Sequence, residues 1–66
     1  MRYRKVSRKR TVATRLIKKG KRITENDFTF KRADDGIYPD ESKFITGRTA
    51  GEDIKEDAPL TWDKLL

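Results

Sequence analysis

At 66 residues, the chain is long enough for one small domain and too short for a second. Hydrophobic residues make up 33% of the sequence and charged residues 42%, so the core must be thin, although three Phe, two Tyr and one Trp argue against disorder. Cys and His are absent, which excludes disulfides, Cys/His zinc sites and catalytic pairs that need a thiol or an imidazole. The longest apolar run is two residues, so we expect no membrane span and no signal sequence.

The charged residues are distributed unevenly along the chain. Residues 1–22 contain eleven Lys or Arg and no acid, a charge of +11, whereas residues 23–66 contain six basic and eleven acidic residues, a charge of −5. Two interpretations stay open: a basic arm that binds nucleic acid or another acidic surface with a steep salt dependence, or a solvated lead-in to the domain. We expect residues 1–10 to form a flexible basic lead-in and residues 11–66 to form the domain.

The first elements are predicted to be two short extended segments around a turn. Apolar and β-branched residues at 11–17 favour a strand. Gly20 suits a turn with positive φ, and residues 22–23 return as a second short strand. Thr24 and Asp27 then have the spacing of a capping box, which predicts one helical turn.

The next segment, residues 29–32, is predicted to be extended, with Phe28 and Phe30 on one face. The remaining elements follow in chain order: a loop at 33–36, a short helix at 40–45 that Gly47 ends, a strand at 48–54, a turn at 55–59, a strand end at 60–61 and a helical turn at 62–66. Segments of two to five residues joined by tight turns predict a mainly β fold.

An internal repeat relates the two halves of the domain. A shift of 37 residues places the segment from Ile17 to Thr24 on the segment from Ile54 to Thr61. Each copy reads as a strand, a turn, a strand and a helical turn, which cannot cover its own apolar side. Two copies are therefore expected to pack against each other around an approximate twofold axis. Apolar residues coincide at three positions: Ile17/Ile54, Ile23/Leu60 and Phe28/Leu65.

The core is expected to form between the two copies. The side chains predicted to build it are Ile17, Ile23, Phe28, Phe30, Ile54, Leu60, Trp62 and Leu65, completed by Ile37, Phe44, Ile45 and Ala50.

Two segments resemble motifs of a known domain family. Residues 17–32, with the sequence IKKGKRITENDFTFKR, are similar to a DIKKGE-x-[IL]-TEENL-x-x-KR pattern, and residues 47–62, with the sequence GRTAGEDIKEDAPLTW, are similar to GK-x-A-x-x-DI-x-x-x-x-PLTW. On these motifs the chain resembles the antifreeze-like (SAF) domain that ends sialic acid synthases, the N-acetylneuraminate synthase family, over about residues 11–65. The resemblance implies a β-clip or "pretzel" fold with a pseudo-twofold repeat, which type III antifreeze proteins share.

The resemblance also implies a function. In the family, a TIM barrel condenses phosphoenolpyruvate with N-acetylmannosamine or a related sugar, using a divalent metal. This chain has no barrel, so we expect it to be non-catalytic alone and to hold neither a cofactor nor a metal. Its implied partners are a TIM-barrel synthase domain, of the same or a partner subunit, and the sugar substrate, in the cytoplasm and away from membranes.

The family's small domain contributes one arginine, which contacts the acetamido group of the sugar in the partner's active site. The matching position here is Arg32, and a planar guanidinium suits this task because it donates several hydrogen bonds in one plane. The family usually has Pro-Gly after this arginine, whereas Ala33-Asp34 follows here. An alternative is therefore an internal ion pair between Arg32 and Asp34 or Asp35.

Two other functions are less favoured by the sequence. Ice binding needs a flat and mostly uncharged patch, but the first turn carries strongly hydrated cations at Lys18, Lys19, Lys21 and Arg22. The acidic pairs Glu52-Asp53 and Glu56-Asp57 suggest acid–base chemistry only weakly. Adjacent strand residues point to opposite faces, and the second pair falls in a predicted turn, so these acids are expected to be solvated.

Overall fold

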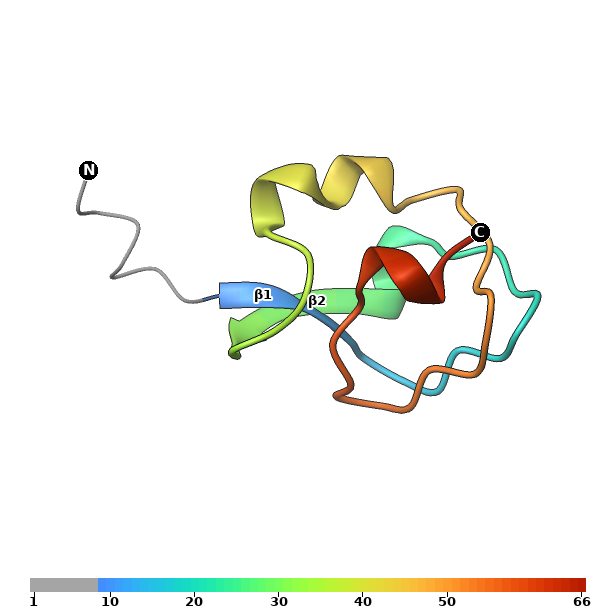
Figure 1. Ribbon diagram of the computed structural model, residues 1–66, viewed down its shortest axis with the longest axis horizontal. Coiled ribbons are helices and arrows are strands. Elements are labelled where there is room, and N and C mark those ends of the chain that lie inside the picture. Colours follow the sequence, from blue (N-terminus) through green and yellow to red (C-terminus); the bar gives the residue numbers. More distant parts are fainter. Residues whose placement is uncertain (1–8) are drawn as a thin grey trace.

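The computed structural model describes residues 9–66 of the chain. Its elements are two strands and three short 3-10 helices: β1 (Lys9–Ala13), η1 (Glu25–Asp27), β2 (Phe28–Arg32), η2 (Pro39–Phe44) and η3 (Trp62–Lys64) (Figure 1). β1 and β2 pair antiparallel, with Ala13 opposite Phe28 and Lys9 opposite Arg32. Residues 9–66 contain no α-helix, so the domain is the small, mainly β structure that the sequence predicts.

Strand β1 includes Lys9 and Arg10, which the sequence places in the lead-in. β1 starts at Lys9, and the guanidinium of Arg10 donates hydrogen bonds to the Gly36 carbonyl oxygen (3.1 Å) and to the Tyr38 hydroxyl (3.2 Å). Arg10 also stacks on the Tyr38 ring, 4.2 Å from its centroid. Two residues of the expected lead-in are therefore part of the sheet, while residues 1–8 lie outside the described part of the chain.

The prediction of a strand at 48–54 is wrong. Instead of a ladder, this segment makes three single bridges to three different parts of the chain, because it bends at Gly51, whose N–H donates to the Lys64 carbonyl oxygen at 2.7 Å. The helix expected at 40–45 is the 3-10 helix η2, and the chain leaves it through Gly47 at a φ of +94°. The three bridges are Arg22 to Thr49, Ala50 to Leu65 and Ile17 to Ile54.

The backbone hydrogen bonds obey the 37-residue repeat. Ile17 and Ile54 each donate an N–H to the other's carbonyl oxygen, both at 2.8 Å, so the pair lies on the pseudo-twofold axis. Bonds on either side occur in equivalent couples. In each couple the N–H of the first residue donates to the carbonyl oxygen of the second, and a shift of 37 residues converts one bond into the other. The couples are Gly20→Ala50 and Asp57→Ala13 (both 2.8 Å), Ala50→Lys21 and Ala13→Ala58 (both 2.9 Å), and Ile23→Arg48 (2.8 Å) and Leu60→Thr11 (2.9 Å).

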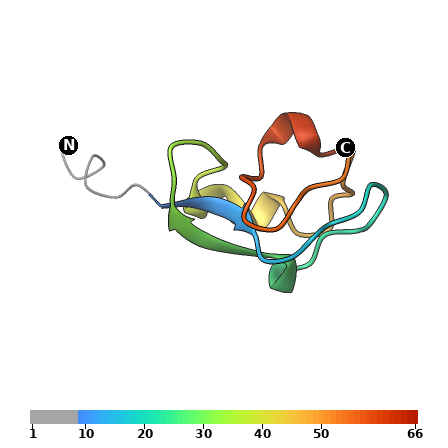
Figure 2. The ribbon, with the colours of Figure 1, turned by 90° about the horizontal axis from the view of Figure 1, so that it is seen from below.

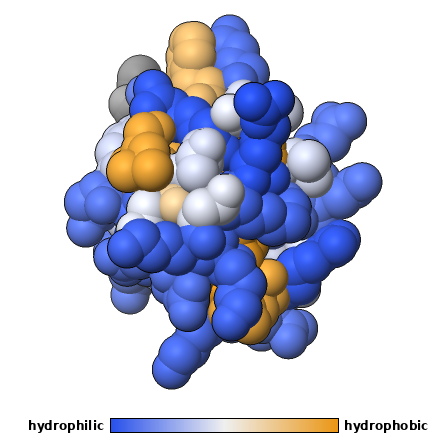
Figure 3. All heavy atoms as spheres, turned by 90° about the vertical axis from the view of Figure 1, so that its right-hand side faces the viewer, coloured by the Kyte–Doolittle hydropathy of each residue, from blue (hydrophilic) through white to orange (hydrophobic). Residues whose placement is uncertain are grey.

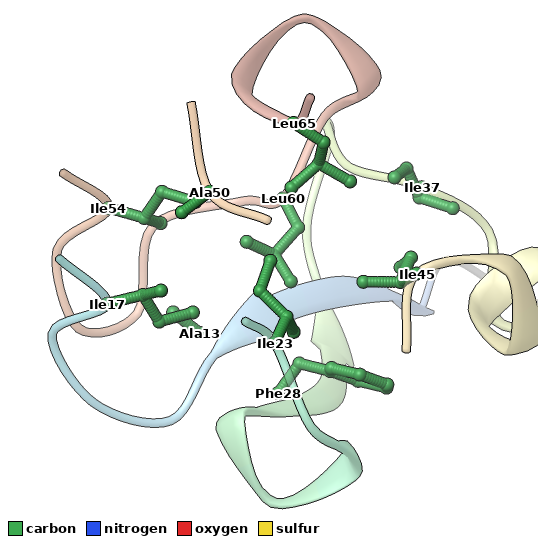
Figure 4. Close-up of a cluster of buried hydrophobic side chains, with 10 residues drawn as sticks. All are labelled: Ala13, Ile17, Ile23, Phe28, Ile37, Ile45, Ala50, Ile54, Leu60 and Leu65. Atoms are coloured by element: carbon green, nitrogen blue, oxygen red, sulfur yellow. The ribbon is translucent and has the colours of Figure 1, made fainter. Parts of the chain in front are cut away.

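The core consists largely of side chains that the repeat pairs. Figure 4 shows Ile23 and Leu60 in its middle, with Leu65 and Phe28 on opposite sides of them. Ile37 and Ile45, from the segment that joins the two copies, close a further side. The full cluster is Ala13, Ile17, Ile23, Phe28, Ile37, Ile45, Ala50, Ile54, Leu60 and Leu65.

Three residues expected in the core lie at the surface. Phe30 is 40% exposed, Trp62 is 42% exposed, and Phe44 is also exposed. Phe30 does share a face with Phe28, and their ring centroids are 6.2 Å apart, but the strand runs beyond the covered part of the sheet. Trp62 opens η3 at the position that Glu25 occupies in η1, a solvent-facing place in both copies.

Candidate functional site

Arg32 is the last residue of β2, opposite the first residue of β1. Side chains at alternate strand positions share a face; on this face Phe28 is buried in the core, whereas Phe30 and Arg32 are exposed. The β-branched and aromatic residues of β2 favour the extended backbone. Pairing with β1 fixes the backbone position of Arg32 at the end of the sheet. Arg32 therefore ends β2 at the end of the sheet where β1 begins, and Figure 1 shows these two strand ends together.

The guanidinium of Arg32 makes no hydrogen bond and no ion pair with any residue in the range 9–66. The internal pair with Asp34 or Asp35, which the sequence left open, does not form. The Asp35 carboxylate instead accepts a hydrogen bond from the N–H of Gly36 at 2.8 Å. All of the donors of Arg32 are thus free to bind a group from outside the described chain.

The loop after Arg32 is held in place from β1. The two hydrogen bonds of Arg10 tie Gly36 and Tyr38 to the strand, and the N–H of Thr11 donates to the Ile37 carbonyl oxygen at 2.9 Å. Gly36 has a φ of +123°, and a Cβ on it would lie 2.8 Å from the Thr11 carbonyl oxygen, so the loop approaches the strand where only glycine fits. These contacts restrain the segment that follows Arg32, which begins with Ala33-Asp34.

The lysine next to Arg32 is already engaged. Lys31 points to the other face of β2, and its Nζ lies 2.7 Å from the Asp57 carboxylate. The bond to Asp57 raises the pKa of Lys31 above its ordinary value of 10.5. Lys31 therefore closes a contact within the domain, and Arg32 is left as the available cation of β2.

A second charged cluster is buried under η1. The Asp27 side chain is 1% exposed; its Oδ2 accepts hydrogen bonds from the Thr24 N–H (2.9 Å) and the Thr24 hydroxyl (3.1 Å), and from Lys21 Nζ at 2.6 Å. Arg15 Nε lies 3.7 Å from the other oxygen. Burial by itself raises the pKa of Asp27, but the bonds from Lys21 and Thr24 outweigh it, so the pKa is lowered from the ordinary 3.8. With all its neighbours inside the domain, this cluster is structural, and it realises the predicted capping box.

Over the described range, no three acidic side chains gather as a metal ion would require. In that same range there is also no helix of the length and apolarity needed to cross a membrane.

The fold and its repeat define a class of small β domains built from two related halves. In this chain, Arg32 has no partner among residues 9–66. The family model described as "SAF domain" matches residues 11–66, and the chain belongs to this family. No curated protein sequence matches the chain significantly. Among solved structures, the chain is similar to the spore coat polysaccharide biosynthesis protein SpsE from Bacillus subtilis, with 27% identity and a TM-score of 0.78. The match covers 88% of this chain and 17% of the SpsE chain, so this chain spans about one sixth of that protein.

Proposed function

We propose that this domain is the substrate-capping module of a synthase of the sialic acid type. It binds to a TIM-barrel catalytic domain, of its own or a partner subunit, and offers Arg32 to the N-acyl group of the sugar substrate. The domain supplies no catalytic group of its own. Membership of the SAF family and the likeness to a much longer polysaccharide biosynthesis protein support this proposal. The cytoplasmic location that goes with it is a further prediction.

The observation that carries the proposal is the state of Arg32. The guanidinium is exposed, lacks a partner within residues 9–66 and leaves the sheet from a paired strand end, which is a stable base for a binding side chain. Its parallel N–H donors suit an acyl oxygen together with a neighbouring hydroxyl. Small-molecule sites bury most of their ligand, so an exposed strand end needs a second surface to enclose a sugar. A catalytic barrel would supply that surface.

The proposal is tested by adding this domain to a sialic acid synthase from which its own SAF domain has been removed, and following condensation of phosphoenolpyruvate with N-acetylmannosamine. The rate is expected to rise with domain concentration and to saturate. Arg32→Ala should abolish most of this rise, since a hydrogen bond to a charged group contributes about 1.5–3 kcal/mol, or roughly tenfold to a hundredfold.

The matched control is Lys55→Ala, which removes one positive charge from an exposed side chain that has no partner within residues 9–66. It should leave the stimulation unchanged. A domain that fails to raise either the rate or the affinity for the sugar, or one whose Arg32→Ala variant acts like the wild type, contradicts the capping role.

A further inference from the structure

The two halves of the domain carry turns of the same backbone shape and opposite charge. We call residues 15–22 the basic turn and residues 52–59, which the 37-residue repeat places on it, the acidic turn. The basic turn has five basic residues and no acid (+5), and the acidic turn has four acids and one lysine (−3). Their backbones correspond closely: Lys21 N–H to the Lys18 oxygen and Ala58 N–H to the Lys55 oxygen both measure 3.0 Å. Since the shared fold requires only the backbone, the cations are not needed to form the turn.

Some of these cations have a structural use and others do not. Lys21 and Arg15 face the buried Asp27. The side chains of Lys18, Lys19 and Arg22 are exposed, and none has a hydrogen bond or ion pair within the part of the chain that the structure describes. Three strongly hydrated charges thus stand within five residues with no internal role.

The basic turn forms a projecting tip. Figures 1 and 2 both place it, in cyan to teal, at the end of the molecule opposite the start of β1. Figure 3 shows that end with a mainly hydrophilic surface on which apolar atoms form only separate spots. Leu16, half exposed, is the only large apolar side chain that the basic turn presents to solvent. The tip is also remote from Arg32, so it is a separate surface from the proposed capping site.

We propose that the basic turn binds the phosphodiester backbone of a double-stranded nucleic acid through Lys18, Lys19 and Arg22, without reading its sequence. A duplex carries one charge per ~1.7 Å of its axis, and each phosphate that a cation neutralises releases condensed counterions. Lysine contacts to phosphate position a protein on a duplex but carry no sequence information. This contact is a function additional to sugar capping.

Binding to another protein fits the tip less well. Protein interfaces have an apolar centre and are depleted in lysine, and the basic turn has neither an aromatic residue nor an apolar surface beyond Leu16. Pairing with the acidic turn of a second copy would rely on exposed ion pairs. Such pairs contribute about 0–1 kcal/mol each, against an association cost of at least about 4 kcal/mol.

The test measures the fluorescence anisotropy of a labelled duplex DNA, and of a duplex RNA of the same sequence, as the intact 66-residue chain is added over about 50 to 200 mM salt. The variant Lys18→Glu/Arg22→Glu is compared with Lys55→Glu/Lys43→Glu, which has the same net charge. Lys55 is the repeat mate of Lys18, and Lys43 is an exposed lysine of η2. Trp62 fluorescence and thermal melting verify folding, and Lys18→Gln/Arg22→Gln replaces the turn variant if the glutamates prevent it.

The wild type is expected to bind duplex at low salt. The basic-turn variant should bind at least tenfold more weakly, with a slope of log affinity against log salt reduced by about 1.8, or ~0.9 for each phosphate that the variant no longer neutralises. The control should keep both the affinity and the slope. Absence of duplex binding, equal losses in both variants, or loss only on removal of residues 1–8 would overturn the proposal. So would tighter binding to phosphatidylglycerol vesicles or to heparin than to either duplex. Since Arg32 is unchanged in these variants, their outcome is independent of the capping function.

Discussion

Ile17 and Ile54 bond to each other through two backbone hydrogen bonds of equal length, each residue acting as donor and acceptor to its own counterpart in the repeat. A residue pairs in this way with its equivalent only if the axis that relates the two copies passes between them. Both side chains are fully buried in the same cluster. The centre of the domain is therefore a symmetric contact between two halves whose sequences have diverged elsewhere.

Shortening the equivalent side chains on the two sides of this axis should lower the free energy of unfolding by the same amount. Ile17→Val and Ile54→Val each remove one buried methylene and are expected to lower the free energy of unfolding by about 1 kcal/mol. The two values, measured by urea unfolding, should agree within about 0.5 kcal/mol, while Leu16→Ala, at a half-exposed position, should change stability by less than that. Clearly unequal losses for the two isoleucines would contradict the equivalence of their surroundings in the core.

The buried carboxylate under η1 should be important for stability. Asp27→Asn removes the charge that Lys21 and Arg15 face, and we expect it to lower the free energy of unfolding by about 2 kcal/mol. Asp63→Asn is the control, because Asp63 is an exposed carboxylate in the equivalent helical turn η3. A loss no larger than that of the control would contradict the structural role of Asp27.

The same carboxylate predicts a pH dependence. The folded state lowers the pKa of Asp27 from 3.8, so its contribution to stability is present above about pH 4 and is lost as the pH falls through the lower folded value. The wild type should therefore lose more stability than Asp27→Asn between about pH 5 and pH 2. Urea midpoints across this range measure the difference, and parallel curves for the two proteins would count against it.

Two glycines with positive φ should differ in their tolerance of a side chain. Gly20 has a φ of +90° and no atom within 4 Å of a new Cβ, so Gly20→Ala should cost about 1 kcal/mol from backbone strain alone. A Cβ on Gly36 would in addition meet the Thr11 carbonyl oxygen at 2.8 Å, and Gly36→Ala should cost clearly more. Thermal melts of the two variants compare these costs. A larger loss for Gly20→Ala than for Gly36→Ala would contradict the predicted clash at Gly36.

Arg48 joins the last turn to η2. Its Nε donates to the Phe44 carbonyl oxygen and its Nη1 to the Leu66 carbonyl oxygen, both at 3.1 Å, and the guanidinium lies 5.3 Å from the centroid of the Trp62 ring. Arg48→Ala is expected to lower stability by about 1 kcal/mol. It should also shift the emission of Trp62, the single tryptophan. An unchanged emission spectrum would show that Arg48 does not cover the ring.

The sequence predicted the paired halves because the repeat keeps its apolar residues wherever both copies face the axis. It predicted the exposure of Phe30 wrongly, since alternation along a strand indicates which face a side chain shares but not how far the covering elements extend over that face. For Trp62 the repeat already held the correct signal: the equivalent residue in the first copy is Glu25, a solvent-facing residue. Position in the repeat therefore predicts the exposure of this side chain better than its aromatic character does.

The site was predictable in part. The motif assigned Arg32 its place after the second extended segment, but the choice between a free guanidinium and an ion pair with the following acids depended on the loop geometry. That geometry is set by Arg10, which the sequence placed in the lead-in and which ties the loop to β1 over a separation of 26 residues. Contacts of such range leave no local pattern in a single sequence.

The Michaelis constant for the N-acyl sugar, measured in a synthase barrel complemented by this domain, tests the capping role of Arg32 most directly. Arg32→Ala is expected to raise this constant at least tenfold while the constant for phosphoenolpyruvate stays the same, and Arg32→Lys should not restore it, because an ammonium lacks the planar pair of donors. Equal sugar constants for the wild type and Arg32→Ala would contradict the capping role.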